Sequence, residues 1–210
     1  MFSLALPLFF FFYHGHAQKP AYGVKAGFNY SSILGDLTEG LKFRFSGHAG
    51  VFMVFDFPGG FALQPELQYS SQGFQFSSDL SAIEGNMPFP GDNDFRTNVQ
   101  LNYLNIPVLA KFSLNDKLTL DFGPQFGFLI NQVTRIKNLD ESNGDVERNS
   151  VSGDFRVDYG GVVGLDIQMS ERFSLVPRFF IGLRNRLDNF AGDVQNYNAA
   201  IQLSLHYRLP

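Results

Sequence analysis

The strongest constraint on the fold is a strict alternation of side chains through residues 198–209, the twelve residues before the terminal proline. The apolar row of this segment is Ala199, Ile201, Leu203, Leu205, Tyr207 and Leu209. The opposite row, which is small or polar, is Asn198, Ala200, Gln202, Ser204, His206 and Arg208. A period of two places these rows on opposite faces of a β-strand. Soluble strands average about five or six residues, whereas a tilted strand that crosses a bilayer needs about 9–11. The segment therefore predicts a membrane-spanning strand.

Alternating segments recur along the rest of the chain. The eight predicted strands cover residues 22–31, 45–57, 61–73, 101–114, 118–131, 157–168, 173–184 and 198–209. Tight polar turns at 58–60, 115–117 and 169–172 alternate with long connections rich in Asp, Asn, Ser and Gly, at 32–44, 74–100, 132–156 and 185–197. Short turns on one rim and long loops on the other are typical of outer-membrane barrels, with the short turns in the periplasm. We therefore expect an all-β fold, an eight-stranded antiparallel up-and-down transmembrane β-barrel.

Four prolines lie inside these predicted strands, namely Pro65, Pro107, Pro124 and Pro177. Because proline has no N–H, each one should interrupt the hydrogen-bonded ladder at a bulge or bend. The alternation continues on both sides of each proline, and bulges are common at barrel rims. We therefore expect the strands to continue through all four positions.

The N-terminal residues have the pattern of a secretory signal peptide. An apolar block at 2–13 is followed by Gly15 and Ala17, small residues ahead of an expected cut before Gln18. No positively charged residue precedes the block, and a buried hydrophobic segment is the alternative. The expected domains are a signal peptide at 1–17 and a barrel domain at 18–210. With no cysteine in the chain, a lipoprotein anchor, disulfides and thiolate chemistry are excluded.

The two faces of the predicted strands differ sharply in polarity. One face is almost free of charge and carries large apolar residues such as Phe28, Val51 and Phe126. The other carries glycines, balanced acidic and basic residues, and one histidine. We expect its charged residues to form a structural polar network in the lumen, consisting of Lys25, Asp56, Glu66, Lys111, Asp121, Asp158, Asp166, Arg178, Arg184, His206 and Arg208. An eight-stranded barrel is only wide enough inside to be filled by side chains, and buried charges are tolerated there when they are paired.

If the polar face lines the lumen, the apolar face must meet lipid. Five tyrosines lie toward the strand ends, where the aromatic girdles of membrane barrels are found: Tyr22, Tyr30, Tyr69, Tyr159 and Tyr207. The alternative is a soluble, lipocalin-like barrel with the apolar face inside. That arrangement would have to fit the aliphatic residues and many of the 25 phenylalanines into an eight-stranded interior.

Composition excludes two further classes. The mean hydropathy is −0.06, and no segment after the N-terminus approaches the run of about 20 apolar residues that a spanning helix needs. A helical-bundle membrane protein is therefore excluded. The formal charge of −4 is mild and no run of Lys and Arg is present, so we expect no nucleic-acid partner.

Several short motifs occur in order along the chain. The first is YLNIPVLAKF at 103–112. It resembles the Tyr-Leu-x-Ile-Pro-x-x-x-Lys-aromatic strand of the PorT-like family of outer-membrane β-barrel proteins of Gram-negative bacteria. GPQFG at 123–127, DYGGVVG at 158–164 and LSLHYRL at 203–209 are similar to its later strands. Such barrels usually finish on an aromatic residue, whereas this chain finishes on Leu209 and Pro210, and Tyr207 is the expected substitute. The resemblance covers the chain after the expected signal peptide and implies a barrel in the outer membrane.

The sequence indicates no catalytic, cofactor-binding or metal-binding residues. His48, expected near the rim of the first long loop, and His206 are the only histidines beyond the expected signal peptide, and no nucleophile motif accompanies them. We expect a non-enzymatic anchor or surface-binding protein of the outer membrane, with a structural or secretion-associated role, no cofactor, lipid around it, and a protein partner at its long loops. The alternatives are a small passive porin-like channel, a lipocalin-like binding barrel and a lipid-modifying barrel enzyme. We also expect Arg208→Glu to disturb folding more than Ser204→Ala.

Overall fold

The computed structural model describes residues 20–36, 38, 41–78, 95–138, 146–150, 156–185 and 195–210. The described part contains nine strands: β1 (Ala21–Gly35), β2 (Leu41–Phe57), β3 (Phe61–Ser78), β4 (Phe95–Asn115), β5 (Leu118–Asn138), β6 (Val146–Ser150), β7 (Val157–Gln168), β8 (Phe173–Gly182) and β9 (Asn196–Arg208). The expected signal peptide at 1–17 lies outside the described residues.

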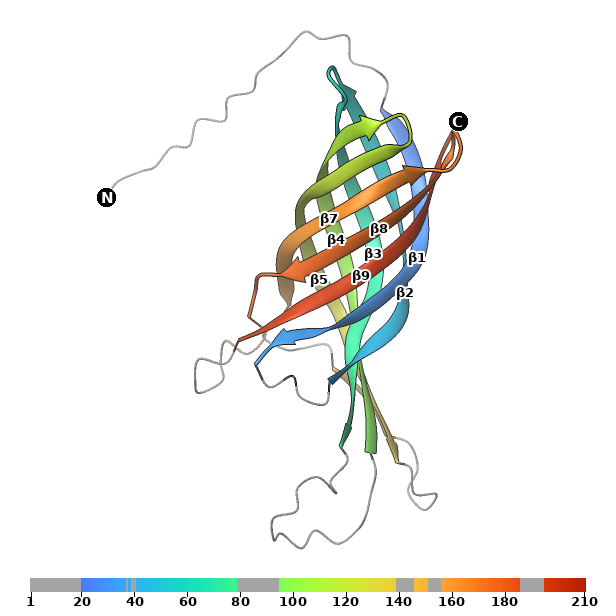
Figure 1. The fold of residues 1–210 in the computed structure, drawn as a ribbon. Helices are drawn as coiled ribbons and strands as arrows, with labels where there is room; N and C mark the ends of the chain where they lie inside the picture. Colours follow the sequence, from blue (N-terminus) through green and yellow to red (C-terminus); the bar gives the residue numbers. More distant parts are fainter. Residues whose placement is uncertain are drawn as a thin grey trace, which may run out of the picture.

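Eight of these strands close into a barrel. Neighbouring strands pair in the order β4-β3-β2-β1-β9-β8-β7-β5, and the additional β4–β5 pairing joins the two edges. Every pairing is antiparallel. The short turns, the start of β1 and the C-terminus lie at one end of the barrel, which we call the short-turn end, and the strand ends that flank the longer connections lie at the other, the long-loop end (Figure 1). The predicted fold class is confirmed.

Several strands are longer at the long-loop end than the sequence predicted. β3 continues to Ser78, β4 begins at Phe95 and β5 continues to Asn138, so these strands extend beyond the rest of the barrel in Figure 1. β6, which pairs with Gln132–Ile136 of β5, was not predicted at all. Backbone pairing outside the membrane needs no apolar row, so the Ser-, Gln- and Asn-rich sequence of these extensions was interpreted as loop.

The prolines do not produce the bulges that we expected. Around Pro65 the β2–β3 pairs stop at Phe52↔Glu66 and resume at Phe55↔Leu63 in the same register. The register shifts fall elsewhere, for example between Phe43 and His48 of β2. A proline removes one donor from the ladder without adding a residue to the strand, so the register is kept.

Gly73 of β3, whose φ is +132°, lies in the part of β3 that faces this shift, where residues 44–47 of β2 lie opposite residues 71–73. A Cβ atom at this position would lie 1.9 Å from the carbonyl oxygen of Val99 on β4. The hydroxyl of Ser31 lies 3.0 Å from both the N–H and the carbonyl oxygen of Gly73. Only glycine combines this backbone conformation with such a close approach.

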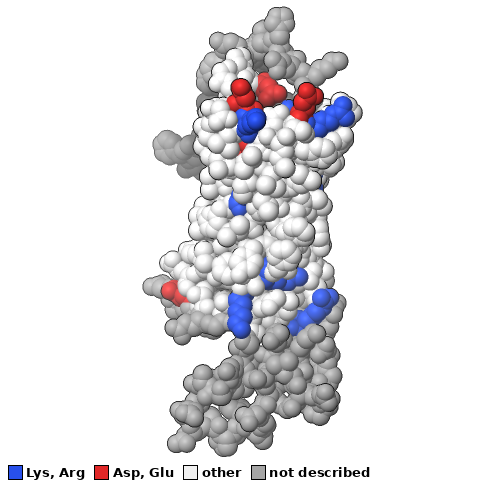
Figure 2. Space-filling view, turned by 45° about the vertical axis from the view of Figure 1, so that its right-hand side comes forward, with Lys and Arg blue, Asp and Glu red and all other residues white. Residues whose placement is uncertain are grey.

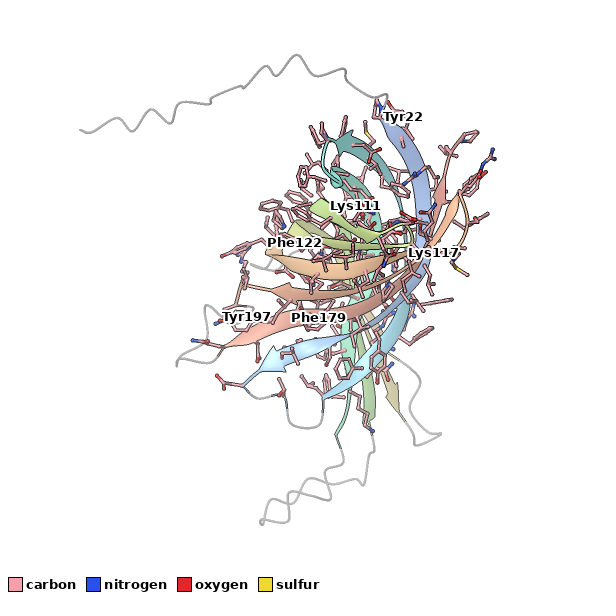
Figure 3. The ribbon with its side chains drawn as sticks, turned by 45° about the horizontal axis from the view of Figure 1, so that its top comes forward. Tyr22, Lys111, Lys117, Phe122, Phe179 and Tyr197 are labelled. Carbon is pink, nitrogen blue, oxygen red and sulfur yellow. The ribbon has the colours of Figure 1, made fainter. Side chains whose placement is uncertain are left out.

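The faces of the barrel are inverted relative to a soluble protein. Asn29, Gln68 and Asp121 are fully buried, whereas Phe28 and Val51 are 57% and 52% exposed. Phe122 and Phe179, labelled in Figure 3, belong to the same exposed outer wall. On the face shown in Figure 2, the charged side chains gather toward the two ends and leave a largely uncharged band between them. An apolar band this extensive requires a nonaqueous surrounding, so the lipocalin-like alternative is wrong.

Aromatic side chains mark the two borders of this band. Tyr22 begins the outward row of β1 at the short-turn end and Tyr30 lies toward the long-loop end, and both are about half exposed, at 49% and 47%. Phe173 packs against Tyr207 with ring centroids 4.9 Å apart, and Tyr30 stacks on Phe43 at 4.5 Å. Tyr69 and Tyr159 are also exposed toward the long-loop end. These are the girdles expected at the two membrane interfaces.

None of the described residues forms a helix long and apolar enough to cross a membrane.

Candidate functional site

Four charged side chains from different parts of the barrel meet in the middle of the lumen and form what we call the central cluster: Lys25 of β1, Glu66 of β3, Asp121 of β5 and Arg178 of β8. Lys25 Nζ lies 2.6 Å from Glu66 Oε2, and Arg178 Nη1 lies 2.8 Å from Glu66 Oε1. Arg178 Nη2 lies 2.6 Å from Asp121 Oδ2. The exposure of all four side chains is 1% or less.

The central cluster is electrically balanced, with two cations and two anions. Each member occupies an inward position of its strand, so the closed sheet allows direct hydrogen bonds between residues far apart in sequence, such as Glu66 and Arg178, 112 positions apart. Unpaired charges would be very costly in a lumen surrounded by lipid, whereas this pairing satisfies them mutually. The zero exposure of Lys25 and Glu66 side chains means that protein atoms fill the lumen at this level.

A second ion pair lies nearer the short-turn end. Lys111 Nζ donates to Asp166 Oδ2 and to Gln64 Oε1, the latter at 3.1 Å. Gln64 Nε2 donates in turn to Glu66 Oε1 at 2.7 Å and so connects this pair with the central cluster.

Beyond this pair the barrel opens into a cavity of about 530 Å³, which we call the vestibule. It is lined by Phe52, Val54, Asp56, Phe57, Gly60, Phe61, Ala62, Gln64, Lys111, Ser113, Asn115, Asp116, Thr119, Asp166, Gln168, Glu171, Arg172, Ser174, His206 and Arg208.

On the long-loop side of the central cluster, neutral polar groups fill the lumen. His48 Nδ1 lies 2.8 Å from Asn29 Oδ1, and His48 Nε2 lies 2.7 Å from the hydroxyl of Ser204. Gln202 also donates to Asn29 Oδ1, at 3.1 Å. Ser204, His48 and Asn29 are therefore connected in the same order as the nucleophile, base and orienting residue of a catalytic triad. Asn29 and Ser204 are fully buried, His48 is 4% exposed, and the vestibule lining includes none of them, so the geometry describes a packed structural network.

Further toward the long-loop end, Arg44 is buried and bonded to neutral acceptors. Its guanidinium donates to Asn98 Oδ1, Ser71 Oγ and Gln100 Oε1 at 2.9–3.0 Å. Nearby polar contacts continue the filling of the lumen, because Asn198 Nδ2 donates to Asp158 Oδ2 at 2.6 Å.

The structure separates the predicted network into a buried part and a rim. Lys25, Glu66, Asp121 and Arg178 meet in the central cluster. The other predicted residues within the lumen are Lys111, Asp158, Asp166 and His206. Arg184 is half-buried at the long-loop end, where it donates to the carbonyl oxygen of Val157.

Two members of the predicted network are corrected. Asp56 and Arg208 are exposed and line the mouth of the vestibule. The alternation pattern places Asp56 and Arg208 on the same face of their strands as the lumen residues. Near the end of a strand, however, this face borders the open mouth of the vestibule. Arg208 therefore lies outside the buried ion pairs.

Both histidines lie inside the lumen. His48 was expected near a rim, but β2 begins as early as Leu41, which places His48 inside the lumen. His206, expected on the polar face, is buried there, and its ring stacks on Phe52 with centroids 4.9 Å apart.

Sequence reasoning missed most of the neutral members of the lumen, above all Asn29, Gln64 and Gln68, which are 0–1% exposed. A signal was present, because Gln64, Glu66, Gln68 and Ser70 form an uninterrupted polar row. The predicted lumen network included only Glu66, the charged residue of this row. Within the described residues, no three His, Asp or Glu side chains are arranged to hold a metal ion.

A closed sheet with an apolar exterior, two aromatic girdles and a lumen filled by buried polar groups defines a membrane-spanning β-barrel. The family model described as "Outer membrane protein beta-barrel domain" matches residues 16–188. The chain therefore belongs to this family and is a protein of the outer membrane, with its short-turn end in the periplasm.

Solved structures of similar shape are outer-membrane barrels. Neisserial surface protein A is 9% identical, with a TM-score of 0.49, over 91% of this chain and 100% of that chain. Ail, the attachment invasion locus protein of Yersinia pestis, is 12% identical, with a TM-score of 0.47, over 91% and 100%. OprG from Pseudomonas aeruginosa is 11% identical, with a TM-score of 0.41, over 93% and 98%. No curated protein matches the sequence.

Proposed function

We propose that the protein is a non-enzymatic outer-membrane barrel with a closed lumen, which acts as an anchor or binding surface at its long-loop end. The observation that supports the closed lumen is the central cluster, whose four side chains have at most 1% exposure. A continuous water path would leave these charges accessible. A barrel that carries nothing through its lumen must act through its ends or its outer wall.

The closed lumen is tested by conductance. Purified full-length mature protein, refolded and inserted into a planar lipid bilayer, should show no steady openings on the nanosiemens scale. The second candidate function, a small passive channel, is favoured by the vestibule of about 530 Å³, which extends into the barrel from one side. Steady single-channel openings would support that candidate and contradict a closed lumen.

The binding surface is proposed to lie on the long connections. Residues 79–94, between β3 and β4, form the longest polar connection and carry four acidic residues, Asp79, Glu84, Asp92 and Asp94. Loops are the segments of a rigid scaffold that most often carry binding residues. We include the chain among the PorT-like barrels on its motif at 103–112, in which Asn105, Pro107, Leu109 and Lys111 face the lumen. A protein partner, in a structural or secretion-associated assembly, fits this proposal.

Loop replacement tests the partner. Replacing residues 79–94 by a short Gly-Asn turn should leave heat-modifiable migration of the barrel on gels unchanged. Crosslinks formed in the native membrane between the barrel and another protein should disappear. Replacement of the Pro58-Gly59-Gly60 turn by Asn-Gly is the control at the opposite end. Unchanged crosslinks after loss of 79–94 would contradict a binding role for this loop.

A further inference from the structure

The vestibule has no part in the function proposed for the long-loop end. It is a cavity of about 530 Å³, within the range of about 300–1,000 Å³ typical of small-molecule sites. Because the short-turn end faces the periplasm, a ligand would enter the vestibule from there.

The mouth of the vestibule is electrically polarised. Arg172 and Arg208 lie side by side, because the N–H of Arg208 donates to the carbonyl oxygen of Arg172 at 2.8 Å. Asp56 lies near the end of β2, before the turn at 58–60, and Asp116 lies on the turn after β4. The turn at 58–60 contacts the end of β4, where the N–H of Ser113 donates to the carbonyl oxygen of Gly60 at 2.9 Å. All four charged side chains are exposed. The part of the wall with Arg172 and Arg208 is therefore mainly cationic, and the part with Asp56 and Asp116 is anionic. The cationic part also contains one acidic residue, Glu171, next to Arg172.

The inner end of the vestibule is built from buried polar groups. Lys111 and Asp166 form an ion pair whose side chains are 8% and 14% exposed, and both line the cavity. His206 also lines it and is 3% exposed. Within the described part of the chain, Nε2 of His206 has no hydrogen-bond partner. Because His206 also lines the cavity, this nitrogen is available for a hydrogen bond to a bound molecule.

We propose that the vestibule binds a short zwitterionic peptide, with its C-terminal carboxylate toward Arg172 and Arg208 and its ammonium group toward Asp56 and Asp116. The lining carries four acidic residues and three Lys or Arg. This near balance is unsuited to a polyanion and suits a ligand that carries one charge of each sign. Phe52, Phe57 and Phe61 supply apolar surface for small side chains. The inference goes beyond the proposed outer surface and is independent of it.

Binding is tested with trialanine on the full mature protein in detergent micelles, by isothermal titration calorimetry. N-acetyl-trialanine and trialanine amide each lack one terminal charge. Trialanine should bind, and each blocked peptide should bind about tenfold more weakly, the loss expected for one charge-assisted hydrogen bond. No binding of trialanine, or equal binding of all three peptides, would overturn the proposal.

Variants test the assigned orientation. Arg208→Gln should weaken trialanine binding about tenfold and should reduce the difference between trialanine and its amide, because one of the two carboxylate partners is gone. Lys117→Gln is the matched control, since Lys117 is an exposed cation of the same rim outside the vestibule lining. Equal affinities of the two variants would contradict the assignment. The titrations with blocked peptides use the wild-type protein, so the proposal can be tested even if a variant fails to fold.

Discussion

Arg178 is the residue on which the interior depends most, because one guanidinium holds two carboxylates from different strands. It contacts Glu66 of β3 and Asp121 of β5, and all three side chains are almost completely buried. Lys25 neutralises the second oxygen of Glu66, so Arg178 is the cation that serves Asp121 within the central cluster. A buried ion pair adds little net stability by itself, but removal of one partner leaves a charge with no compensation.

We therefore predict that Arg178→Ala lowers the free energy of unfolding by about 3–5 kcal/mol. Urea titration of the refolded barrel in detergent would measure this loss. Arg172→Ala provides the control, since this exposed arginine should change stability by less than about 0.5 kcal/mol. Equal stabilities of the two variants would show that the central cluster is not buried and paired as described.

The structure reverses the expected ranking of Ser204 and Arg208. Ser204 is fully buried and its hydroxyl lies 2.7 Å from His48 Nε2, whereas Arg208 is exposed. Ser204→Ala leaves the imidazole nitrogen without a partner and should cost about 1–3 kcal/mol, whereas Arg208→Glu should cost less than about 0.5 kcal/mol. The same unfolding titrations decide, and a larger loss for Arg208→Glu would restore the original expectation.

Alternation alone was sufficient to place the charged residues of the central cluster on one face, because every member has inward neighbours two positions away on its own strand. It could not predict which charges pair. Lys25 and Glu66 are 41 residues apart and lie on strands that are not neighbours, so their contact depends on strand stagger and lumen width. Those quantities follow from the closed register of all eight strands.

At the scale of secondary-structure elements, the strand centres were predictable and the long-loop ends were not. The centres carry an apolar row imposed by lipid, whereas the extension of β4 from Phe95 to Gln100 is held by backbone pairs with β3 and β5 and by Val99 in a small hydrophobic cluster. The prolines were predictable only in part. The sequence shows that each one lacks a backbone N–H donor, but only the strand pairs on either side of each proline show that the register is kept.

The close approach of β3 to β4 at Gly73 gives a testable prediction at the scale of these strands. Gly73→Ala places a Cβ atom 1.9 Å from Val99 O at a φ of +132°, so we expect a loss of about 1–3 kcal/mol or more. Gly161→Ala is the matched control, because nothing lies within 4 Å of a Cβ at that position of β7. Unfolding titrations should show Gly161→Ala near wild type. Equal behaviour of the two variants would contradict the close approach of β3 and β4 at Gly73.

At the scale of the whole molecule, the apolar band predicts a cost that depends on membrane depth. Val163 lies midway along the outward row of β7, and Met169 follows this strand at the short-turn end. Val163→Arg should destabilise the barrel by about 2–4 kcal/mol, and Met169→Arg by about 0–1 kcal/mol. Reversible unfolding from lipid vesicles would measure both. A similar cost at the two positions would contradict a lipid-facing band.

The closed lumen is the central claim, and the reactivity of single cysteines tests it most directly. The chain has no cysteine, and Ser→Cys changes volume little. Ser174 lines the vestibule, whereas Ser204 is fully buried farther along the lumen. With a small cationic methanethiosulfonate reagent added to the folded barrel, the Ser174→Cys variant should react rapidly, and the Ser204→Cys variant should react only after unfolding. Equal rapid reaction of both variants would show a water-filled lumen and contradict this account.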